Sequence, residues 1–251
     1  MNKLKSKKSS IKLIIKKLIS FFNYRFYKKT IANSSDLQLL KLIDSLSINK
    51  VFDIGANEGQ FGQSIRKGGY KGQIVSFEPL SDAWIELKKN ANNDSNWLIH
   101  ERVAIGNSNG EIKINISNNS VSSSVLPMLK QHSSAASDSV YIAEETVPIV
   151  TFDSIASQYL NNESNIFLKI DTQGFEWEVL EGAKDTLHLV KGVIVELSLV
   201  PLYDGQRLWK DIINKLENEG FTLWALQEVF TDPNTGQSLQ FDGIFIKNKL
   251  L

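Results

Sequence analysis

The sequence predicts an α/β domain built on a doubly wound, mainly parallel sheet. Three observations predict this fold: apolar runs alternate with segments of helical periodicity, the first run ends in a glycine-containing turn that opens a helix, and a late run is apolar at nearly every position. Such alternation is typical of parallel sheets, whose strands are buried on both faces. We expect the domain to occupy residues 31–251, after a basic amphipathic segment over 1–30.

The first half of the domain is expected to supply three strands and three helices. Capping side chains and a glycine pair mark where helices begin and end, and unbroken apolar runs mark strands. In chain order the elements are a helix over 36–46, a strand over 51–54, a helix over 60–67 ended by Gly68-Gly69, a strand over 74–78, a helix capped by Ser81 or Asp82, and a third strand over 96–105.

After the third strand the alternation breaks. Residues 111–116 alternate apolar and polar side chains, a period typical of an antiparallel strand, and residues 117–140 are rich in serine with few large apolar groups. We therefore expect an insertion made of an antiparallel strand and a mobile loop. Because long loops in compact domains often serve as lids or binding loops, we expect this loop on the substrate side of a site.

The remaining residues return to alternating strands and helices. They are expected to form a helix over 153–160, a strand over 166–170, a helix over 175–183, a strand over 193–197, and a helix through Leu208, Ile212 and Leu216 that ends at Gly220. Two final runs, 221–226 and 241–246, flank a strong turn signal at 232–236. They predict a hairpin that adds an antiparallel edge to the sheet.

The most informative stretch is 51–59, Val-Phe-Asp-Ile-Gly-Ala-Asn-Glu-Gly, a strand followed by a glycine turn and a helix. This geometry brings a backbone close to a nucleotide-like ligand, but a dinucleotide fingerprint would have glycine where Asn57 stands. S-adenosylmethionine (SAM) has no pyrophosphate, its ammonium would suit the Asp53 carboxylate, and Glu78 stands where a ribose-binding acid is expected. The candidate cofactor-binding residues are Asp53, Gly55, Asn57, Gly59, Glu78 and Ala104. The alternative is an ordinary strand–helix turn with a solvated Glu78.

Later segments, together with 51–59, resemble the FkbM methyltransferase family. They read Val-Pro-Ile-Val-Thr-Phe-Asp-Ser-Ile over 147–155, Phe-Leu-Lys-Ile-Asp-Thr-Gln-Gly-Phe-Glu over 167–176 and Val-Leu-Glu-Gly-Ala over 179–183, and Ser122-Ser123-Ser124 and Phe-Asp-Gly-Ile-Phe-Ile over 241–246 also fit. The resemblance implies a Rossmann-like class I methyltransferase fold. It also implies SAM-dependent methylation of a hydroxyl, often of a sugar in a glycan or polysaccharide, or of a secondary metabolite. Gln173 departs from the family, many of whose members carry an acid there.

Four carboxylates are expected at the carboxyl ends of parallel strands, where open α/β sheets bind ligands: Asp53, Glu78, Asp171 and Glu196. Each would lower stability if it were buried without a partner, so their gathering indicates a site. We expect Asp171 to act at the point of methyl transfer, with Glu196 and Glu176 as further candidates for a general base. If a metal takes part, Asp171 and Glu196 are its candidate ligands, and oxygen donors would favour Mg²⁺ or Mn²⁺.

Three histidines are further candidates for a base. His100 is expected in the third strand and His132 in the serine-rich loop, from which it could reach a substrate. His188 is expected to be exposed after a helix.

Charge is distributed unevenly along the chain. Nine lysines and Arg25, with no acid, give residues 1–30 a charge of +10, so the rest of this neutral chain carries −10. An acidic body does not suit a protein that binds nucleic acid through its phosphates, so we expect no nucleic-acid partner. The absence of cysteine excludes disulfides and thiolate metal sites, and it fits a reducing, cytoplasmic location.

Apolar residues in the basic segment recur at helical spacing: Ile11, Ile14, Ile15, Leu18, Phe22 and Phe26. Its longest uncharged stretch, residues 18–24, is far shorter than the roughly 20 residues needed to span a bilayer. Two interpretations remain. Residues 11–27 could lie on an anionic membrane at its inner face, or they could form a helix that packs on the body or on a partner subunit.

Two other functions are weighed against methyl transfer to a hydroxyl. A non-catalytic scaffold in a glycan-assembly complex would have no physical need for the acids and glycines at the strand ends. A nucleic-acid methyltransferase is disfavoured by the acidic body and by Asp171-Thr-Gln-Gly after the fourth strand, where an Asn-Pro-Pro-Tyr or Asp-Pro-Pro-Tyr motif would be expected.

Overall fold

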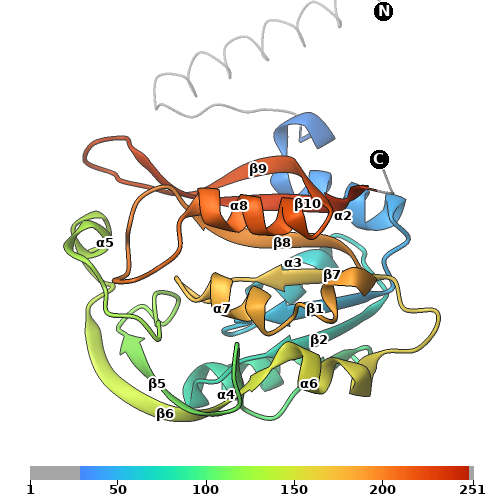
Figure 1. Cartoon of the computed structure of the whole chain (residues 1–251), viewed down its shortest axis with the longest axis horizontal. Helices are drawn as coiled ribbons and strands as arrows, with labels where there is room; N and C mark the ends of the chain where they lie inside the picture. The colour runs from blue at the N-terminus through green and yellow to red at the C-terminus, as the bar shows by residue number, and fades with distance from the viewer. Residues whose placement is uncertain (1–28, 249–251) are drawn as a thin grey trace, which may run out of the picture.

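The computed structural model describes residues 29–248 of the chain (Figure 1). Its central sheet has seven strands, in the order β3 (Trp97–Ile99), β2 (Gln73–Phe77), β1 (Lys50–Ile54), β7 (Ile166–Ile170), β8 (Val190–Ser198), β10 (Ser238–Lys247) and β9 (Phe221–Thr231). A second sheet has three strands, in the order β4 (Ala104–Gly106), β6 (Tyr141–Thr151) and β5 (Gly110–Ser117).

The central sheet is mainly parallel, as the sequence predicts. β1 pairs in parallel with β2 and β7, and β7 pairs in parallel with β8. The expected C-terminal hairpin is present, but β10 lies between β8 and β9 and is antiparallel to both, so β9 forms the edge of the sheet. The two hairpin strands are longer than the apolar runs that predicted them.

Helices cover both faces of the central sheet. One face packs on α2 (Ser35–Ser45), α3 (Gln60–Lys67) and α4 (Ser81–Ala91), and the other packs on α6 (Phe152–Ala156), α7 (Glu176–Glu181) and α8 (Trp209–Asn218). The α2, α3, α4 and α8 helices occur where the sequence placed them, and α6 continues into a short 3-10 turn that completes the helix expected over 153–160.

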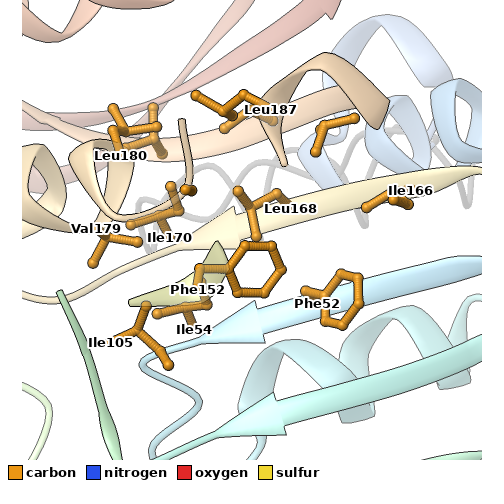
Figure 2. Packing of buried hydrophobic residues seen from close by; sticks show 14 of the residues in the cluster. Phe52, Ile54, Ile105, Phe152, Ile166, Leu168, Ile170, Val179, Leu180 and Leu187 are labelled. Carbon is orange, nitrogen blue, oxygen red and sulfur yellow. The ribbon is translucent and has the colours of Figure 1, made fainter. Parts of the chain in front are cut away.

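Alternate residues of each central strand face the two helical layers, which is why the strands read as unbroken apolar runs. In β7, Phe167 packs in the layer of α2 to α4, whereas Leu168 packs in the layer of α6 to α8. Figure 2 shows the second layer, where the ring of Phe152 from α6 meets that of Phe52 from β1 edge to face, with centroids 5.0 Å apart. Both rings are fully buried, and burying one such side chain stabilises the fold by about 1.5–3 kcal/mol.

The third predicted strand is wrong as a single element. The chain leaves the central sheet after β3 and enters the second sheet as β4, so residues expected to form one strand over 96–105 belong to two sheets. Polar residues interrupt the apolar run between them, and Arg102 forms an ion pair with Glu145 of β6 at 2.7 Å. This long-range pair ties the interruption to the second sheet.

The insertion contains the antiparallel strand that the sequence predicts, because β5 pairs antiparallel with β6. β6 was not predicted as a strand from the sequence. The serine-rich segment after β5 includes a short helix, α5 (Lys130–Ala135). Ser124 is buried, and its backbone exchanges two hydrogen bonds with Asn115 of β5, at 2.8 and 3.1 Å. This segment therefore packs on the second sheet and is held next to the carboxyl ends of the central strands.

Candidate active site

A cavity of about 360 Å³ opens at the carboxyl ends of β1, β2 and β7, the position at which open α/β sheets bind ligands. Its volume is within the usual range for small-molecule sites, about 300–1,000 Å³. The walls are mostly apolar. The polar side chains among its lining residues are Asn57, Gln60, Glu78, Ser120, Ser123, Ser124, Lys169, Asp171, Thr172, Gln173 and Asp242.

The turn after β1 lies against the end of β7. Gly55 has a φ of 73°, and a Cβ at this position would lie 1.8 Å from the carbonyl oxygen of Asp171. Only glycine allows both the left-handed backbone and this close approach. Asn57, also left-handed with a φ of 47°, follows in the same turn and lines the cavity. The expected glycine turn is therefore present, and it forms one wall of the cavity.

Glu78 holds this turn in place from the end of β2. Its Oε2 accepts a hydrogen bond from the backbone N–H of Asn57 at 2.8 Å, and its Oε1 accepts one from that of Leu80 at 2.9 Å. The side chain lines the cavity but is only 4% exposed, and burial raises its pKa to about 7. Each oxygen keeps lone-pair capacity for a ligand hydroxyl, since a carboxylate offers about four acceptor sites.

Asp53 lies in a buried polar row across three strands. The register places Ser76 of β2, Asp53 of β1 and Lys169 of β7 side by side. Lys169 Nζ is 3.1 Å from Asp53 Oδ1 and donates to the Gly55 carbonyl at 2.8 Å, while Ser76 Oγ donates to Asp53 Oδ2 at 3.3 Å. Burial opposes the charge of Lys169, but Asp53 and Asp171 hold its pKa above the usual value.

This row changes the role expected for Asp53. Its carboxylate is fully buried and is not among the residues that line the cavity, whereas Lys169 is. A buried charge requires a partner, and Lys169 supplies it. The sequence suggested a direct contact between Asp53 and a cofactor ammonium. In this arrangement Asp53 instead pairs with Lys169, and it is Lys169 that lines the cavity. A lysine inside the apolar strand over 166–170 was the signal that the sequence analysis did not use.

Asp171 follows β7 and lines the cavity with a side chain that is 41% exposed. Its Oδ1 accepts a hydrogen bond from Gln173 Nε2 at 2.9 Å, and the same nitrogen donates to Glu196 Oε2 at 3.0 Å. Two carboxylates that the sequence placed at the sheet edge are therefore brought together by one amide. Asp171 is the more exposed of the two, since Glu196 is only 6% exposed and lies behind the cavity wall.

Glu176 and Glu196, the other candidates for a base, are buried next to Asp171 and accept hydrogen bonds from residues 172–174 that follow it. Glu176 accepts hydrogen bonds from the backbone N–H groups of Thr172 and Gly174, at 3.0 Å each, and does not line the cavity. Burial raises its pKa to about 7. Burial also raises the pKa of Glu196 well above the usual value, and Asp171 is the next largest cause. Both groups are therefore inclined to hold a proton.

Asp242 is a cavity residue that the sequence analysis missed. β10 places it directly opposite Glu196 of β8, and its side chain lines the cavity. Burial and then the nearby Asp171 raise its pKa to about 7, while Lys169 opposes this shift. An acid within the apolar run over 241–246 was the available signal.

The geometry does not support a metal site. Among residues 29–248, no group of three or more His, Cys, Asp or Glu side chains is placed to hold a metal ion. The pair considered for Mg²⁺ or Mn²⁺, Asp171 and Glu196, faces an amide nitrogen that donates to both. Donor N–H groups repel a cation, so these residues do not fit the ion.

The remaining candidates divide between the cavity and the core. Ala104 lines the cavity, as expected. Gly59 does not; its φ is 90° and a Cβ there would lie 2.8 Å from the side chain of Leu87, so this glycine serves the packing of α3.

The histidines lie outside the cavity lining. His132 is buried, with its ring centroid 5.1 Å from that of Tyr203, and burial lowers its pKa to about 4. His100 packs on Phe77 at 5.2 Å. His188 is exposed, as expected.

Part of the serine-rich segment covers the cavity. Ser120, Ser123 and Ser124 are among the lining residues, and Ser124 Oγ donates to the carbonyl oxygen of Gln173 at 2.6 Å. The segment therefore contacts the same residue that bridges the two carboxylates. This position is consistent with the substrate-side role expected for the loop.

Residues 53–223 match the family described as Methyltransferase FkbM domain, which confirms the resemblance of the motifs. No curated protein matches.

Solved structures with a similar backbone share little sequence identity with this chain. One is a putative RNA methyltransferase from Pyrococcus horikoshii, with 13% identity, covering 85% of this chain and 81% of that chain at a TM-score of 0.45. Another is magnesium protoporphyrin IX methyltransferase from Synechocystis PCC 6803 with bound SAM, with 10% identity, 84% and 75% coverage and a TM-score of 0.46. A third is a putative tRNA methyltransferase from Streptococcus pneumoniae in complex with SAM, with 10% identity, 84% and 72% coverage and a TM-score of 0.46.

Proposed function

Because the chain belongs to the FkbM family of SAM-dependent methyltransferases, we propose that it transfers a methyl group to a hydroxyl oxygen, that of a sugar in a glycan, polysaccharide or secondary metabolite. The observation that carries this proposal is the Asp171 carboxylate, which is 41% exposed in the cavity while Glu78, Glu176 and Glu196 are buried. A hydroxyl is a weak nucleophile at neutral pH, so its methylation benefits from a base held at the point of transfer.

The residues of the cavity fit SAM. Glu78 presents carboxylate oxygens that can accept from ribose hydroxyls, and the backbone from Gly55 to Asn57 forms the adjacent wall. Phe77 and Ala104 offer apolar surface for an adenine ring. Acids outnumber Lys169 around the cavity, and such an environment favours a ligand that carries a positive sulfonium.

When bound, SAM supplies a methyl group on a positively charged sulfur that leaves as a neutral thioether. Asp171 would accept the proton of the attacking hydroxyl while the new carbon–oxygen bond forms, so the oxygen does not retain a positive charge. Lys169 lies 3.6 Å from Asp171 Oδ2 and holds that carboxylate at the end of β7. The serine hydroxyls of the covering segment could orient an acceptor, and orientation alone can contribute several kcal/mol.

A screen tests the proposed function. Purified protein and labelled SAM would be incubated with glycans and nucleotide sugars from its own cell, with total RNA as a separate arm. We expect label in a sugar fraction and none in RNA. Thermal denaturation with SAM is the companion measurement, because a ligand that binds only the folded state raises its stability. Absence of SAM stabilisation, or label in RNA alone, would contradict the proposal.

We also propose that residues 11–27 contact an anionic membrane surface; these residues lie outside the described part of the chain. The support is their apolar stripe within a segment of charge +10 on an otherwise acidic protein. Within residues 29–248, no helix combines the length and the apolar character that crossing a bilayer requires. Each basic group near such a surface contributes about 1 kcal/mol, and salt weakens the attraction.

Liposome sedimentation tests this contact. The full chain should sediment with anionic vesicles at low salt and be released as salt rises, and a protein that begins at Thr30 should remain folded and lose the association. If the shortened protein aggregates or unfolds, the segment packs on the body instead.

A further inference from the structure

The amide of Gln173 lies between two carboxylates. Its Nε2 donates to Asp171 Oδ1 at 2.9 Å and to Glu196 Oε2 at 3.0 Å, so both hydrogens of the amide are used. The backbone of Gln173 has a φ of 53°, which is rare for a side chain of this length and marks a position that the surrounding structure holds in place. Strained positions of this kind gather at functional sites.

Tyr203 and the two carboxylates together set which way the Gln173 amide points. Its hydroxyl is 2.8 Å from Gln173 Oε1 and 3.3 Å from the carbonyl oxygen of Ser122. Both neighbours are acceptors, so the single hydroxyl hydrogen serves the shorter bond to Oε1. Turning the amide over would face its oxygen toward the two acids and its N–H₂ toward the buried hydroxyl. In this arrangement the side-chain carbonyl of Gln173 points away from the carboxylate pair and toward Tyr203.

The pair also has little positive charge near it. The charged and titratable groups that face it are Lys169 of β7, Asp53 of β1, Glu176 of α7, Asp242 of β10 and Tyr203. Lys169 is the one cation among them. Its Nζ lies 3.1 Å from Asp53 Oδ1 and 3.6 Å from Asp171 Oδ2, so its charge is shared between two carboxylates and it reaches Asp171 only at the longer distance. Asp171 and Glu196 both lie within 3.0 Å of one nitrogen, and two carboxylates held this close need a cation, a proton or a shared donor between them. The shared donor observed here is neutral.

We propose that Gln173 takes the place of a bridging divalent cation and acts as the positioning residue for Asp171. A cation bound to both carboxylates would lie about 2.0–2.6 Å from their oxygens, in the space that the two N–H groups fill. The amide holds Asp171 toward the cavity without adding charge, and its backbone carbonyl accepts from Ser124 of the covering segment. The use of Asp171 as a base rests on the proposed function, whereas the amide bridge does not.

Thermal denaturation in EDTA and in excess MnCl₂ tests the bridge without any acceptor. The readout is the shift in the denaturation midpoint that Mn²⁺ causes and that Asp171→Asn removes. For the native chain we expect no such Asp171-dependent shift. Gln173→Glu brings a third carboxylate to the pair, so Mn²⁺ should raise its midpoint by about 3 °C or more, and adding Asp171→Asn should abolish this gain.

Three results would overturn the proposal. They are an Asp171-dependent Mn²⁺ response of the native chain, a folded Gln173→Glu variant with no such response, and native turnover by Gln173→Met. The methionine side chain is uncharged and of similar length but cannot donate, so we expect it to keep SAM affinity and lose turnover about tenfold or more on the acceptor found by the screen. If Gln173→Glu fails to fold, the native chain, Asp171→Asn and Gln173→Met still decide the question.

SAM stabilisation of the native chain is measured in the same plates. Its absence would remove the proposed function and leave the result on the amide bridge intact, so the two failures are distinguishable.

Discussion

The acids on the two sides of the cavity are held in different ways. On the β1–β2 side, each acid has its own donors: Glu78 binds two backbone N–H groups, and Asp53 binds Lys169 and Ser76. On the β7–β10 side, Asp171 and Glu196 share one amide nitrogen, and the charge of Lys169 opposes the protonation of Asp242. Under the proposed function, the first arrangement shapes the cofactor site. The second brings together acids whose protons can move.

One backbone contact joins the two sides. The turn after β1 approaches the end of β7 so closely that Gly55 has no room for a side chain beside the Asp171 carbonyl. Under the proposed function, cofactor binding and the placement of the base therefore both depend on this contact.

Gly55→Ala should have the largest effect, because it disturbs both sides at once. The new Cβ would lie 1.8 Å from the Asp171 carbonyl oxygen and would sit on a backbone with a φ of 73°. The left-handed backbone costs about 1–2 kcal/mol and overpacking about 1–3 kcal/mol, so the free energy of unfolding should fall by about 2–5 kcal/mol. Urea denaturation followed by circular dichroism measures it.

Gly236→Ala is the matched control for this change. Gly236 has a φ of 74°, but no atom lies within 4 Å of the position its Cβ would take. The control should lose only the backbone contribution, about 1–2 kcal/mol. Equal losses of unfolding free energy in the two variants would mean that the close approach of Gly55 to the end of β7 does not contribute to the effect.

Asp171→Asn should separate chemistry from cofactor binding. The amide cannot take up a proton, so turnover should fall about 10²-fold or more while SAM affinity is retained. Labelled-SAM kinetics on the identified acceptor and calorimetry with SAM provide the two measurements. Asp185→Asn, at an exposed position outside the cavity, is the control and should change neither. Normal turnover by Asp171→Asn would exclude this residue from the chemistry.

The β1–β2 side could be predicted well from sequence because its signals are local. Residues 51–59 contain the whole turn, and Glu78 ends the next strand of the same unit. Asp171 and Glu196 also occur at the expected edge, since the rule for strand ends needs only the order of elements. What the sequence could not supply was the pairing of Asp53 with Lys169, which requires the register between β1 and β7.

The β7–β10 side depends on contacts between distant parts of the chain. Asp242 reaches the cavity only because β10 inserts beside β8, and nothing local distinguishes this from an edge strand. Gln173 looked like a departure from a family pattern, yet its partners come from β8 and from the residues before α8. The division of the third strand likewise depends on Arg102 and its distant partner Glu145.

Glu78→Ala tests the β1–β2 side alone. Loss of the acceptor for ligand hydroxyls should weaken SAM binding by about 1.5–3 kcal/mol with little effect on proton transfer. Burial raises the pKa of Glu78 to about 7, so its ionised fraction falls below that pH. The Kd for SAM should therefore rise as pH falls from about 8 to 6, by up to about tenfold per unit, and Glu78→Gln should flatten this dependence. Calorimetry across this pH range measures both.

The raised pKa of Glu78 makes folding stability depend on pH in the opposite direction to SAM binding. The native state holds a proton that the unfolded chain has lost above its ordinary value of 4.5, so this group lowers stability as pH rises from 4.5 to about 7. Glu78→Gln should remove that slope in urea denaturation. A binding profile that stays unchanged in Glu78→Gln would assign the pH dependence to another group.

Tyr203→Phe should give the smallest effect, and it isolates the orientation of the Gln173 amide on the β7–β10 side. Removing the hydroxyl leaves Gln173 Oε1 without the donor at 2.8 Å, which should lower the free energy of unfolding by about 1 kcal/mol. Tyr141→Phe is the control, because its hydroxyl donates to the Leu126 carbonyl at 2.7 Å in the same segment but does not contact Gln173. Both variants should lose similar stability. Since only the first frees the amide to turn its oxygen toward Asp171, only Tyr203→Phe should lower turnover, by a few-fold, with SAM affinity unchanged. Equal turnover in the two variants would show that the hydroxyl serves the packing of the segment and not the placement of Asp171.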